Sequence, residues 1–236
     1  MKILLTGGRG MVGTNILNHE FAHGHAIDSP DRNELDLRDK AAVRSYLKRT
    51  SPELIIHAGG LVGGIKANIT FPYQFLLENV EIGANVIGSA VEVGIPRLLN
   101  LSSSCIYPKD RDEALTEDMI LAGRLESTNE GYAIAKIAAL RLCEFVDSKV
   151  DALQYKTLIP CNLYGPHDKF DLNNAHLIPA IISKMHGAKI RNESFVEIWG
   201  DGKARREFMY VADLVEAIYR AVNDFENTPS LMNLGL

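Results

Sequence analysis

Tyr132 and Lys136 lie four residues apart in the segment YAIAK, which has the composition of a helix. Residues i and i+4 of a helix project from the same face, so the phenol and the ammonium should lie side by side. A free tyrosine has a pKa of about 10, and a nearby ammonium lowers this pKa by favouring the phenolate. The pair is therefore suited to pass a proton to or from a carbonyl or hydroxyl oxygen. The spacing also occurs by chance, so a structural role remains the alternative.

Two serines, Ser103 and Ser104, follow the strand-like run Arg97–Leu101 upstream of this pair. A serine hydroxyl at the end of a strand could hold by hydrogen bond the same oxygen that Tyr132 would protonate. Such a hydroxyl could equally cap the end of the strand. The serines together with the Tyr–Lys pair favour a catalytic reading more strongly than the pair alone.

The N-terminal segment MKILLTGGRGMVG predicts a strand, a tight turn and the start of a helix. Gly7 would permit the turn, Gly10 would let a pyrophosphate approach the backbone, and Gly13 would let the helix and strand pack closely. Phosphates would then bind at the helix N-terminus, where free N–H groups and the helix dipole favour anions. Because the spacing is G-x-x-G-x-x-G rather than G-x-G-x-x-G, a glycine-rich turn without a ligand remains the alternative.

Strand-like and helical runs alternate through the first part of the chain. The strand-like runs are Lys2–Thr6, roughly His25–Asp28, Leu54–Ala58, Arg97–Leu101 and Leu153–Ile159. The helical runs are Met11–Glu20, Lys40–Lys48, Pro72–Val93 and Tyr132–Val150. This alternation predicts an α/β fold with a doubly wound parallel sheet of the Rossmann type. Ligands of such sheets bind beyond the carboxyl ends of the strands, so the glycine turn and the serines should face one crevice.

The pattern is less regular after Ile159. Pro160, Pro166, residues 168–174 and residues 200–206 are typical of the loops of a smaller, substrate-facing region. The run Ala212–Asn223 predicts a helix with Asp213 as its N-terminal acceptor, and Met232–Leu234 predicts a short strand. We therefore expect a cofactor-binding Rossmann domain over 1–160, a small substrate-binding region over 161–208, and a helix and strand over 209–236 that return to the first domain.

The composition is that of a globular protein, with 46% hydrophobic and 23% charged residues. The net charge of −5 argues against a general nucleic-acid binder, which would be basic. The sequence contains no apolar run of about 18 residues and no signal-peptide pattern, so we expect neither a membrane span nor secretion. Three cysteines without a C-x-x-C pair fit reduced thiols in a cytoplasmic protein. We assign no metal site.

The glycine turn, the serine after the fourth strand and the Y-x-x-x-K spacing together resemble the extended short-chain dehydrogenase/reductase family. Longer stretches are similar to the nucleotide-sugar epimerase–reductases of that family: GRGMVG (8–13), NELDL (33–37), VGGIKAN (62–68), SSCIYP (103–108), TNEGYAIAKIA (128–138), NLYGPHD (162–168), HLIPA (176–180) and WGDGKARREF (199–208). They occur in family order over nearly the whole chain. The resemblance implies a Rossmann fold, an NADP cofactor and conversion of GDP-4-keto-6-deoxy-D-mannose to GDP-L-fucose. In that reaction C3 and C5 are epimerised and C4 is then reduced by hydride.

The resemblance also implies roles for five residues. Ser103, Tyr132 and Lys136 match the family's catalytic triad, in which the first two hold the C4 oxygen and Tyr132 donates the proton. Cys105 and His176 match the acid–base pair of the epimerisation, which must remove a proton from one face of a carbon and return it to the other. A thiolate and an imidazole both titrate near neutrality when tuned. Without the family, Cys105 is typical of a buried structural thiol and His176 of a residue at the start of a helix.

The cofactor contacts follow in the same way. Arg9 and Arg32 match the family's phosphate contacts, and arginine suits the 2′-phosphate of NADP, although Asp28 lies near the position of the acid found in NAD-binding proteins. The residues implied to bind the cofactor are Gly7, Arg9, Gly10, Met11, Val12, Gly13, Arg32, Asp36, Leu37 and Lys136. Those implied to bind the nucleotide-sugar substrate are Lys184, Trp199 and Arg206. The structural alternatives are a core aromatic at Trp199 and a solvated arginine pair at residues 205–206.

Family members continue for many tens of residues past the strand that Met232–Leu234 matches, so the resemblance implies that the substrate-binding region over 161–208 is incomplete. We therefore expect good NADP binding and weak nucleotide-sugar binding. Two other functions stay open: a related reductase or epimerase acting on another nucleotide sugar, and a non-catalytic NADP-binding scaffold. The presence of all five catalytic residue types argues against the scaffold. The long segment Pro72–Val93 and the helix that follows Tyr132 also carry apolar positions beyond those that one sheet face can cover. We therefore expect a homodimer.

Overall fold

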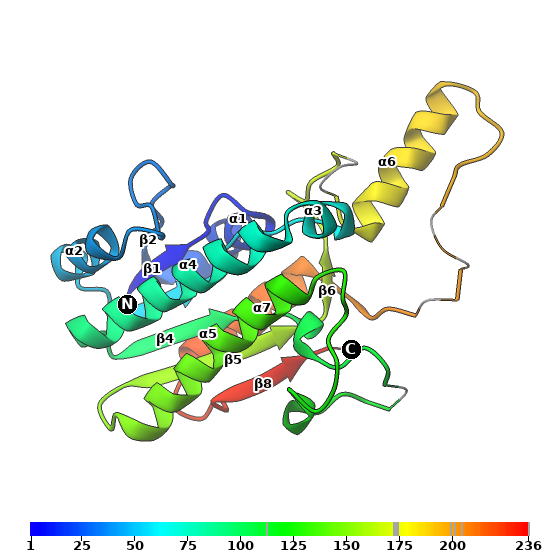
Figure 1. Ribbon diagram of the computed structural model, residues 1–236. Coiled ribbons are helices and arrows are strands. Elements are labelled where there is room, and N and C mark those ends of the chain that lie inside the picture. The colour runs from blue at the N-terminus through cyan, green and yellow to red at the C-terminus, as the bar shows by residue number, and fades with distance from the viewer. Residues whose placement is uncertain (112, 172–174, 199, 201, 204, 236) are drawn as a thin grey trace.

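The computed structural model describes residues 1–235 except 112, 172–174, 199, 201 and 204. Six parallel strands form the central sheet in the order β2-β1-β3-β4-β5-β8. They are β1 (Lys2–Thr6), β2 (Ala26–Asp28), β3 (Leu54–His57), β4 (Arg97–Leu101), β5 (Gln154–Pro160) and β8 (Leu231–Leu234). The chain adds β2 on one side of β1 and the later strands on the other, so the strand order reverses between β1 and β3 (Figure 1).

Helices cover both faces of this sheet, as the prediction of a doubly wound fold requires. The helices α1 (Met11–Asn18) and α7 (Val211–Asn223) pack on one face, and α2 (Lys40–Thr50), α4 (Pro72–Val93) and α5 (Glu130–Lys149) pack on the other (Figure 1). The two cores divide by strand alternation: in β1, Ile3 and Leu5 face α7, whereas Leu4 faces α4. Strands buried on both faces read as continuous apolar runs, which is why their sequence pattern was clear.

The remaining elements are α3 (Ile65–Thr70), the 3₁₀ turns η1 (Glu20–Gly24), η2 (Ser104–Ile106) and η3 (Glu117–Met119), the strands β6 (Asn162–Tyr164) and β7 (Phe208–Tyr210), and α6 (Leu177–Ile190). Of these, η1 precedes β2 at the amino ends of the strands, and the others lie at or beyond the carboxyl ends. The strands β6 and β7 form a separate two-stranded parallel sheet. Figure 1 shows α6 extending away from the central sheet, joined to β7 by a long irregular segment. Many of its apolar side chains are exposed, Ile182 and Met185 among them.

The observed boundaries agree best with the predicted ones where a regular apolar pattern continues over a long segment. The expected helix Pro72–Val93 is observed with those bounds. The first helix ends at Asn18 rather than at Glu20, because His19 adopts an extended conformation and begins the turn η1. The expectation for Asp213 is wrong: Tyr210 precedes α7, no side chain caps the helix, and Asp213 lies in its first turn, where its charge favours the dipole.

The glycine turn between β1 and α1 supports a direct stability prediction. A Cβ at Gly13 would lie 2.3 Å from the Gly7 carbonyl oxygen and 2.5 Å from the Gly8 Cα, both backbone atoms that cannot move cheaply. We expect Gly13→Ala to lower the free energy of unfolding by about 1–3 kcal/mol, the usual cost of overpacking. Gly24→Ala is the control, because its Cβ would meet nothing within 4 Å. Equal midpoints of urea denaturation for the two variants would contradict this account of the turn.

Candidate active site

A groove of about 270 Å³ opens at the carboxyl ends of β1, β2 and β3, where the strand order reverses. Three segments line it: the glycine turn after β1, the loop between β2 and α2, and the Gly59–Leu61 segment after β3. Glu78 and Ile82 of α4 complete its wall. Ligands of doubly wound sheets bind at this position, so the groove is the first candidate site.

The glycine turn has the shape that a dinucleotide requires. Gly7 has a φ of +77°, and a Cβ there would lie 2.6 Å from the Ala58 carbonyl oxygen. A Cβ at Gly10 would meet only the Gly7 oxygen, at 3.4 Å, so the backbone at Gly10 stays open to a ligand. Gly10 is also the N-cap of α1 and makes no side-chain capping bond, which leaves N–H groups of the first turn available for an anion. These features fit a pyrophosphate cradle.

Three arginines line the groove, and each has a carboxylate partner. Arg9 makes a short ion pair with Asp31. Arg32 lies 4.0 Å from the Glu78 carboxylate, a longer contact, and both side chains stay largely exposed, at 81% for Arg9 and 65% for Arg32. Of the two arginines expected to meet a phosphate, Arg32 is therefore the less engaged.

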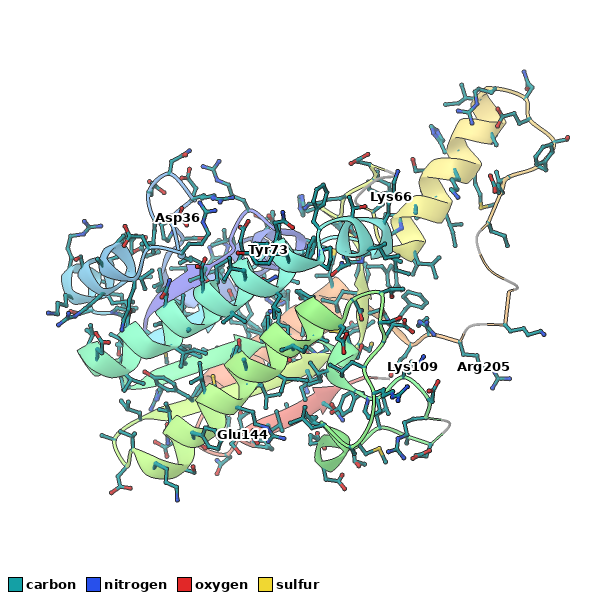
Figure 2. All side chains as sticks on the ribbon, in the orientation of Figure 1. Asp36, Lys66, Tyr73, Lys109, Glu144 and Arg205 are labelled. Carbon is teal, nitrogen blue, oxygen red and sulfur yellow. The ribbon has the colours of Figure 1, made fainter. Side chains whose placement is uncertain are left out.

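Arg38 is the third arginine and was not recognised from the sequence. It makes a two-point contact with Asp36, with Nε at 3.0 Å and Nη2 at 2.7 Å from the carboxylate oxygens. These bonds and the Arg38 backbone N–H lower the pKa of Asp36 to about 2. Figure 2 shows Asp36 on the loop that follows β2. Asp28, the candidate acid for a ribose, instead accepts a hydrogen bond from the Tyr46 hydroxyl at 2.8 Å.

Tyr132 and Lys136 lie in the first turns of α5, beyond the end of β4. The Lys136 Nζ donates to the Leu101 carbonyl oxygen at 2.9 Å and lies 5.6 Å from the centre of the Tyr132 ring. Burial lowers the pKa of Lys136 to about 8, and burial likewise raises the pKa of Tyr132. The Phe75 ring packs edge-on against Tyr132, with centroids 6.5 Å apart. The two side chains thus lie side by side, as the spacing predicts. The expected lowering of the tyrosine pKa by the ammonium is not observed, because burial of the phenol outweighs it.

Ser103 is the N-cap residue of η2, and Cys105 lies within this turn, which follows β4. The Ser103 hydroxyl accepts a long hydrogen bond, 3.5 Å, from the Cys105 backbone N–H, so it caps this turn as the alternative reading allowed. Burial raises the pKa of the Cys105 thiol to about 11, although Ser103 and the Lys136 ammonium act in the opposite direction. The Lys136 ammonium lies over the Tyr132 ring, and the Cys105 thiol is close enough to both groups to shift the pKa of each, so the three side chains form one cluster.

A row of buried polar side chains under the crevice was missed by the sequence analysis. Thr6, His57, Asn100 and Thr157 are register partners across β1, β3, β4 and β5, and each is at most 2% exposed. The Thr6 Oγ1 lies 2.8 Å from the His57 Nδ1 and accepts from the Gly59 backbone N–H, which ties the row to the groove. Burial and the nearby Lys136 lower the pKa of His57 to about 3, so the imidazole is neutral. Only the strand register brings these four positions together.

The candidate residues of the second region lie on and after α6. His176 is the N-cap residue of α6 and has an exposed side chain. Loss of solvent around the imidazole disfavours its charged form and lowers the pKa of His176, whereas the nearby Asp168 carboxylate acts to raise this pKa. Neither Cys105 nor Tyr132 is among the described groups that shift this pKa, so the expected Cys105–His176 pairing is not established.

Of the expected substrate contacts, Lys184 donates to the Glu197 carbonyl oxygen at 2.9 Å. Arg206 is exposed and its Nη1 donates to the neighbouring Arg205 carbonyl oxygen. Figure 2 shows Arg205 on the extended segment between α6 and β7. Trp199 lies outside the described residues.

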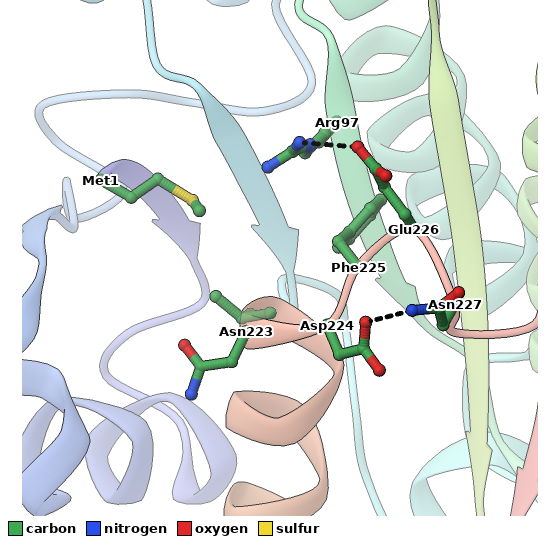
Figure 3. Close-up of a pocket in the computed structure, with 8 residues that line it drawn as sticks. Met1, Arg97, Asn223, Asp224, Phe225, Glu226 and Asn227 are labelled. Carbon is green, nitrogen blue, oxygen red and sulfur yellow. Dashed lines mark hydrogen bonds and ion pairs between the residues drawn. The ribbon is translucent and has the colours of Figure 1, made fainter.

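A second hollow, of about 300 Å³, lies at the amino ends of the strands beside Met1 and Arg97 (Figure 3). Four of its polar side chains form two pairs, Arg97 with Glu226 at 3.8 Å and Asn227 with Asp224 at 2.7 Å. It lies at the opposite end of the sheet from the glycine turn. We therefore place the chemistry at the carboxyl ends of the strands.

The described part of the chain holds no group of His, Cys, Asp and Glu side chains that could bind a metal ion. Within the same residues, no helix is long and apolar enough to cross a membrane.

Comparison with known proteins decides the family. The model of the NAD dependent epimerase/dehydratase family matches residues 3–235. The chain belongs to this family. It is 55% identical to GDP-L-colitose synthase of Yersinia pseudotuberculosis, over 100% of this chain and 77% of that protein. It is 47% identical to GDP-L-fucose synthase of Azorhizobium caulinodans, over 100% of this chain and 75% of that protein.

A solved structure agrees with this assignment. The GDP-L-fucose synthetase from Naegleria fowleri bound to NADP superposes with a TM-score of 0.86 at 26% identity, covering 99% of this chain and 76% of that one. The fold predicted from the sequence, a doubly wound parallel sheet, is therefore confirmed both by the strand order and by this family member. The NADP bound in that structure is the kind of dinucleotide that the glycine turn and the groove of this chain could hold.

Proposed function

We propose that this chain is an NADP-dependent epimerase–reductase that converts GDP-4-keto-6-deoxy-D-mannose to GDP-L-fucose. One observation carries the proposal: a Tyr132–Lys136 pair and the thiol of Cys105 cluster at the carboxyl end of β4, in a chain 47% identical to a GDP-L-fucose synthase. A scaffold needs no such cluster, whereas reduction at C4 needs a proton donor and epimerisation needs an acid–base group.

For the reduction, a bound reduced nicotinamide would supply the hydride that C4 of the keto sugar receives. Ser103 and Tyr132 hold the C4 oxygen by hydrogen bonds, and Tyr132 transfers its phenolic proton to that oxygen. The Lys136 ammonium beside the ring stabilises the phenolate that remains and so makes the transfer easier. Lys136 would also help to hold the ribose of the cofactor.

For the epimerisation, Cys105 and His176 exchange the protons at C3 and C5 from opposite faces of the sugar ring. The C4 carbonyl makes these protons acidic, because the negative charge left on carbon spreads onto the carbonyl oxygen that Tyr132 and Ser103 hold. Lys184, Trp199 and Arg206 would bind the nucleotide. The planar fork of Arg206 matches a diphosphate.

A second candidate is the corresponding reaction that yields GDP-L-colitose, which the 55% identity to a GDP-L-colitose synthase favours. Colitose lacks the 3-hydroxyl of fucose, so its 4-keto precursor has a methylene at C3 and only C5 can be epimerised. The two candidates require the same tyrosine, lysine and cysteine, and they differ in what faces C3.

The test is incubation of the protein with NADPH and either GDP-4-keto-6-deoxymannose or its 3-deoxy analogue. Loss of the absorbance of the reduced nicotinamide measures reduction, and analysis of the released sugar identifies the epimer. Turnover of the first compound to GDP-L-fucose supports the proposal. Preference for the 3-deoxy compound supports the second candidate, and turnover of neither refutes both.

Cofactor choice provides a prediction on Arg9 and Arg32. Both line the groove near the site expected for a 2′-phosphate, which carries two negative charges that NADH lacks. We expect replacement of both arginines by Gln to weaken NADPH binding by on the order of 10²-fold, as loss of two charge-assisted contacts implies, and NADH binding by much less. Calorimetry with the two cofactors measures this. An equal loss for both would show that the arginines serve the turn rather than the phosphate.

We further propose a cytoplasmic homodimer formed through α4 and α5. Their outer faces expose apolar side chains, among them Leu77, Ile134, Leu142 and Phe145. A two-fold dimer could cover both faces at once. We expect sedimentation at micromolar concentration to give twice the chain mass of 26.1 kDa, and Phe145→Glu to shift the protein towards the monomer. A wild-type monomer would contradict the proposal.

The proposed cytoplasmic location is supported by the three free cysteines, which fit a reducing compartment.

A further inference from the structure

Glu78 places a carboxylate in the groove that is otherwise expected to hold an anion. It lies on α4, across the groove from the loop that carries Arg32 and Arg38. One of its oxygens, Oε2, is 3.6 Å from the Arg38 Nη1 and 4.0 Å from the Arg32 Nη2. Its side chain is 27% exposed. The carboxylate is thus shared between two guanidinium groups at the edge of the cofactor groove.

The other two carboxylates of the groove, Asp31 and Asp36, differ from Glu78 because they accept hydrogen bonds from backbone N–H groups of the loop. Asp31 accepts hydrogen bonds from the backbone N–H groups of Asn33 and Glu34 and so closes a turn of the loop. Asp36 accepts from the backbone N–H of Arg38 in the same way. Among the described residues, the partners of Glu78 are the two arginine side chains. Its charge therefore acts on the arginines without fixing the loop.

Three arginines and three carboxylates line the groove, so their formal charges cancel before any ligand is bound. A 2′-phosphate near Arg32 would replace Glu78 as the counterion, and the carboxylate would then face the phosphate. Two like charges a few ångströms apart repel each other even in a solvated groove. A ligand without that phosphate would leave the arginines paired with Glu78 and escape the penalty.

We propose that Glu78 is a specificity-determining residue that limits the preference of the groove for a 2′-phosphorylated dinucleotide. This inference rests on the cofactor part of the proposed function. The carboxylate lowers the affinity for the phosphorylated ligand selectively, and its partner Arg38 holds it at the groove edge.

The test compares binding of 2′-phospho-ADP-ribose and of ADP-ribose by calorimetry, so that no turnover is needed. We expect Glu78→Gln to tighten binding of the phosphorylated compound by on the order of tenfold, while binding of ADP-ribose stays within about twofold. The difference should shrink as salt is raised, because the groove is open to solvent. Glu78 is partly exposed, so the substitution should leave the fold intact, which circular dichroism verifies.

Glu92→Gln is the matched control. Glu92 lies on the same helix, about 21 Å further along by helical rise, and its carboxylate also bridges two cations, Lys40 at 2.7 Å and Arg44 at 3.4 Å. This variant removes the same charge and should change neither affinity. A similar gain in both variants would overturn the proposal by showing a general charge effect.

Two further results would also overturn it. An unchanged ratio of affinities in Glu78→Gln would show that Glu78 does not sense the phosphate, and weaker binding of the phosphorylated compound would show that Glu78 orients the arginines for it. If the unaltered protein fails to prefer the phosphorylated compound but Glu78→Gln does prefer it, the proposal holds and the assignment of NADP to the natural protein fails. Failure to convert a nucleotide sugar bears on the proposed reaction alone.

Discussion

Tyr132→Phe is expected to lower turnover of the nucleotide sugar by on the order of 10²–10⁴-fold, the usual contribution of a positioned general acid. The substitution removes one oxygen from a half-buried ring and keeps the packing against Phe75. Without the phenol, the C4 oxygen has no adjacent donor when hydride arrives, so negative charge must build up there. NADPH binding should persist, because the cofactor groove is lined by other segments.

Tyr219→Phe is the control for the loss of a tyrosine hydroxyl. The Tyr219 hydroxyl is buried and donates to the Ile16 carbonyl oxygen at 2.8 Å, on the face of the sheet covered by α1 and α7. Its removal should cost about 1 kcal/mol of stability and leave turnover unchanged. Stopped-flow measurement of NADPH oxidation compares the two variants. Near-normal reduction by Tyr132→Phe would remove Tyr132 from the mechanism.

The same pair predicts how reduction depends on pH. Burial lowers the pKa of Lys136 to about 8, so its ammonium is present below that pH and is lost as the pH rises through it. We therefore expect the reduction rate to fall above about pH 8. Lys136→Arg keeps a positive charge at all accessible pH values and should remove this fall, even if its absolute rate is low. A rate that keeps rising beyond pH 9 would contradict the role of the ammonium.

The fold was predictable because its signals are local and strong. The inner strands of the central sheet, β1, β3, β4 and β5, are buried on both faces, so runs such as Ile3–Leu5 stand out from the polar segments around them. The helix Pro72–Val93 has a proline at its start and Gly94 in the left-handed conformation at its end, and both ends were found. The helix α6 was less evident, because apolar residues surround its whole circumference and give no clear period.

The site was predictable only in part, for a related reason. The glycine turn and the Tyr–Lys spacing are short segments whose chemistry is visible in sequence. Arg38 and Glu78 are 40 residues apart on different elements, and each alone is typical of a solvated charge. The row that includes His57 requires the strand register, which sequence does not supply. Charges and buried polar groups that act in pairs across elements thus emerge only from the fold.

Cys105→Ser is expected to slow exchange of the C3 and C5 protons with solvent deuterium by on the order of 10²-fold or more. A serine hydroxyl has nearly the size of the thiol but is far less acidic, so it replaces the thiol in packing and not in proton transfer. Burial raises the pKa of the Cys105 thiol to about 11, so only a small fraction is thiolate at neutral pH. If the thiolate is the base, the exchange rate should rise with pH through the neutral range, opposite to the trend expected for reduction.

Mass spectrometry of the recovered nucleotide sugar measures this exchange without NADPH, which separates epimerisation from reduction. Cys143→Ser is the control, because it makes the same change of sulfur to oxygen at a residue that is fully buried on the core-facing side of α5. It should lower stability and leave exchange per folded molecule unchanged. An exchange rate that is flat across neutral pH would instead make the protonated thiol the donor. Exchange at the parent rate in Cys105→Ser would show that the thiol is structural and would leave the epimerisation to other residues, with His176 the first to be tested.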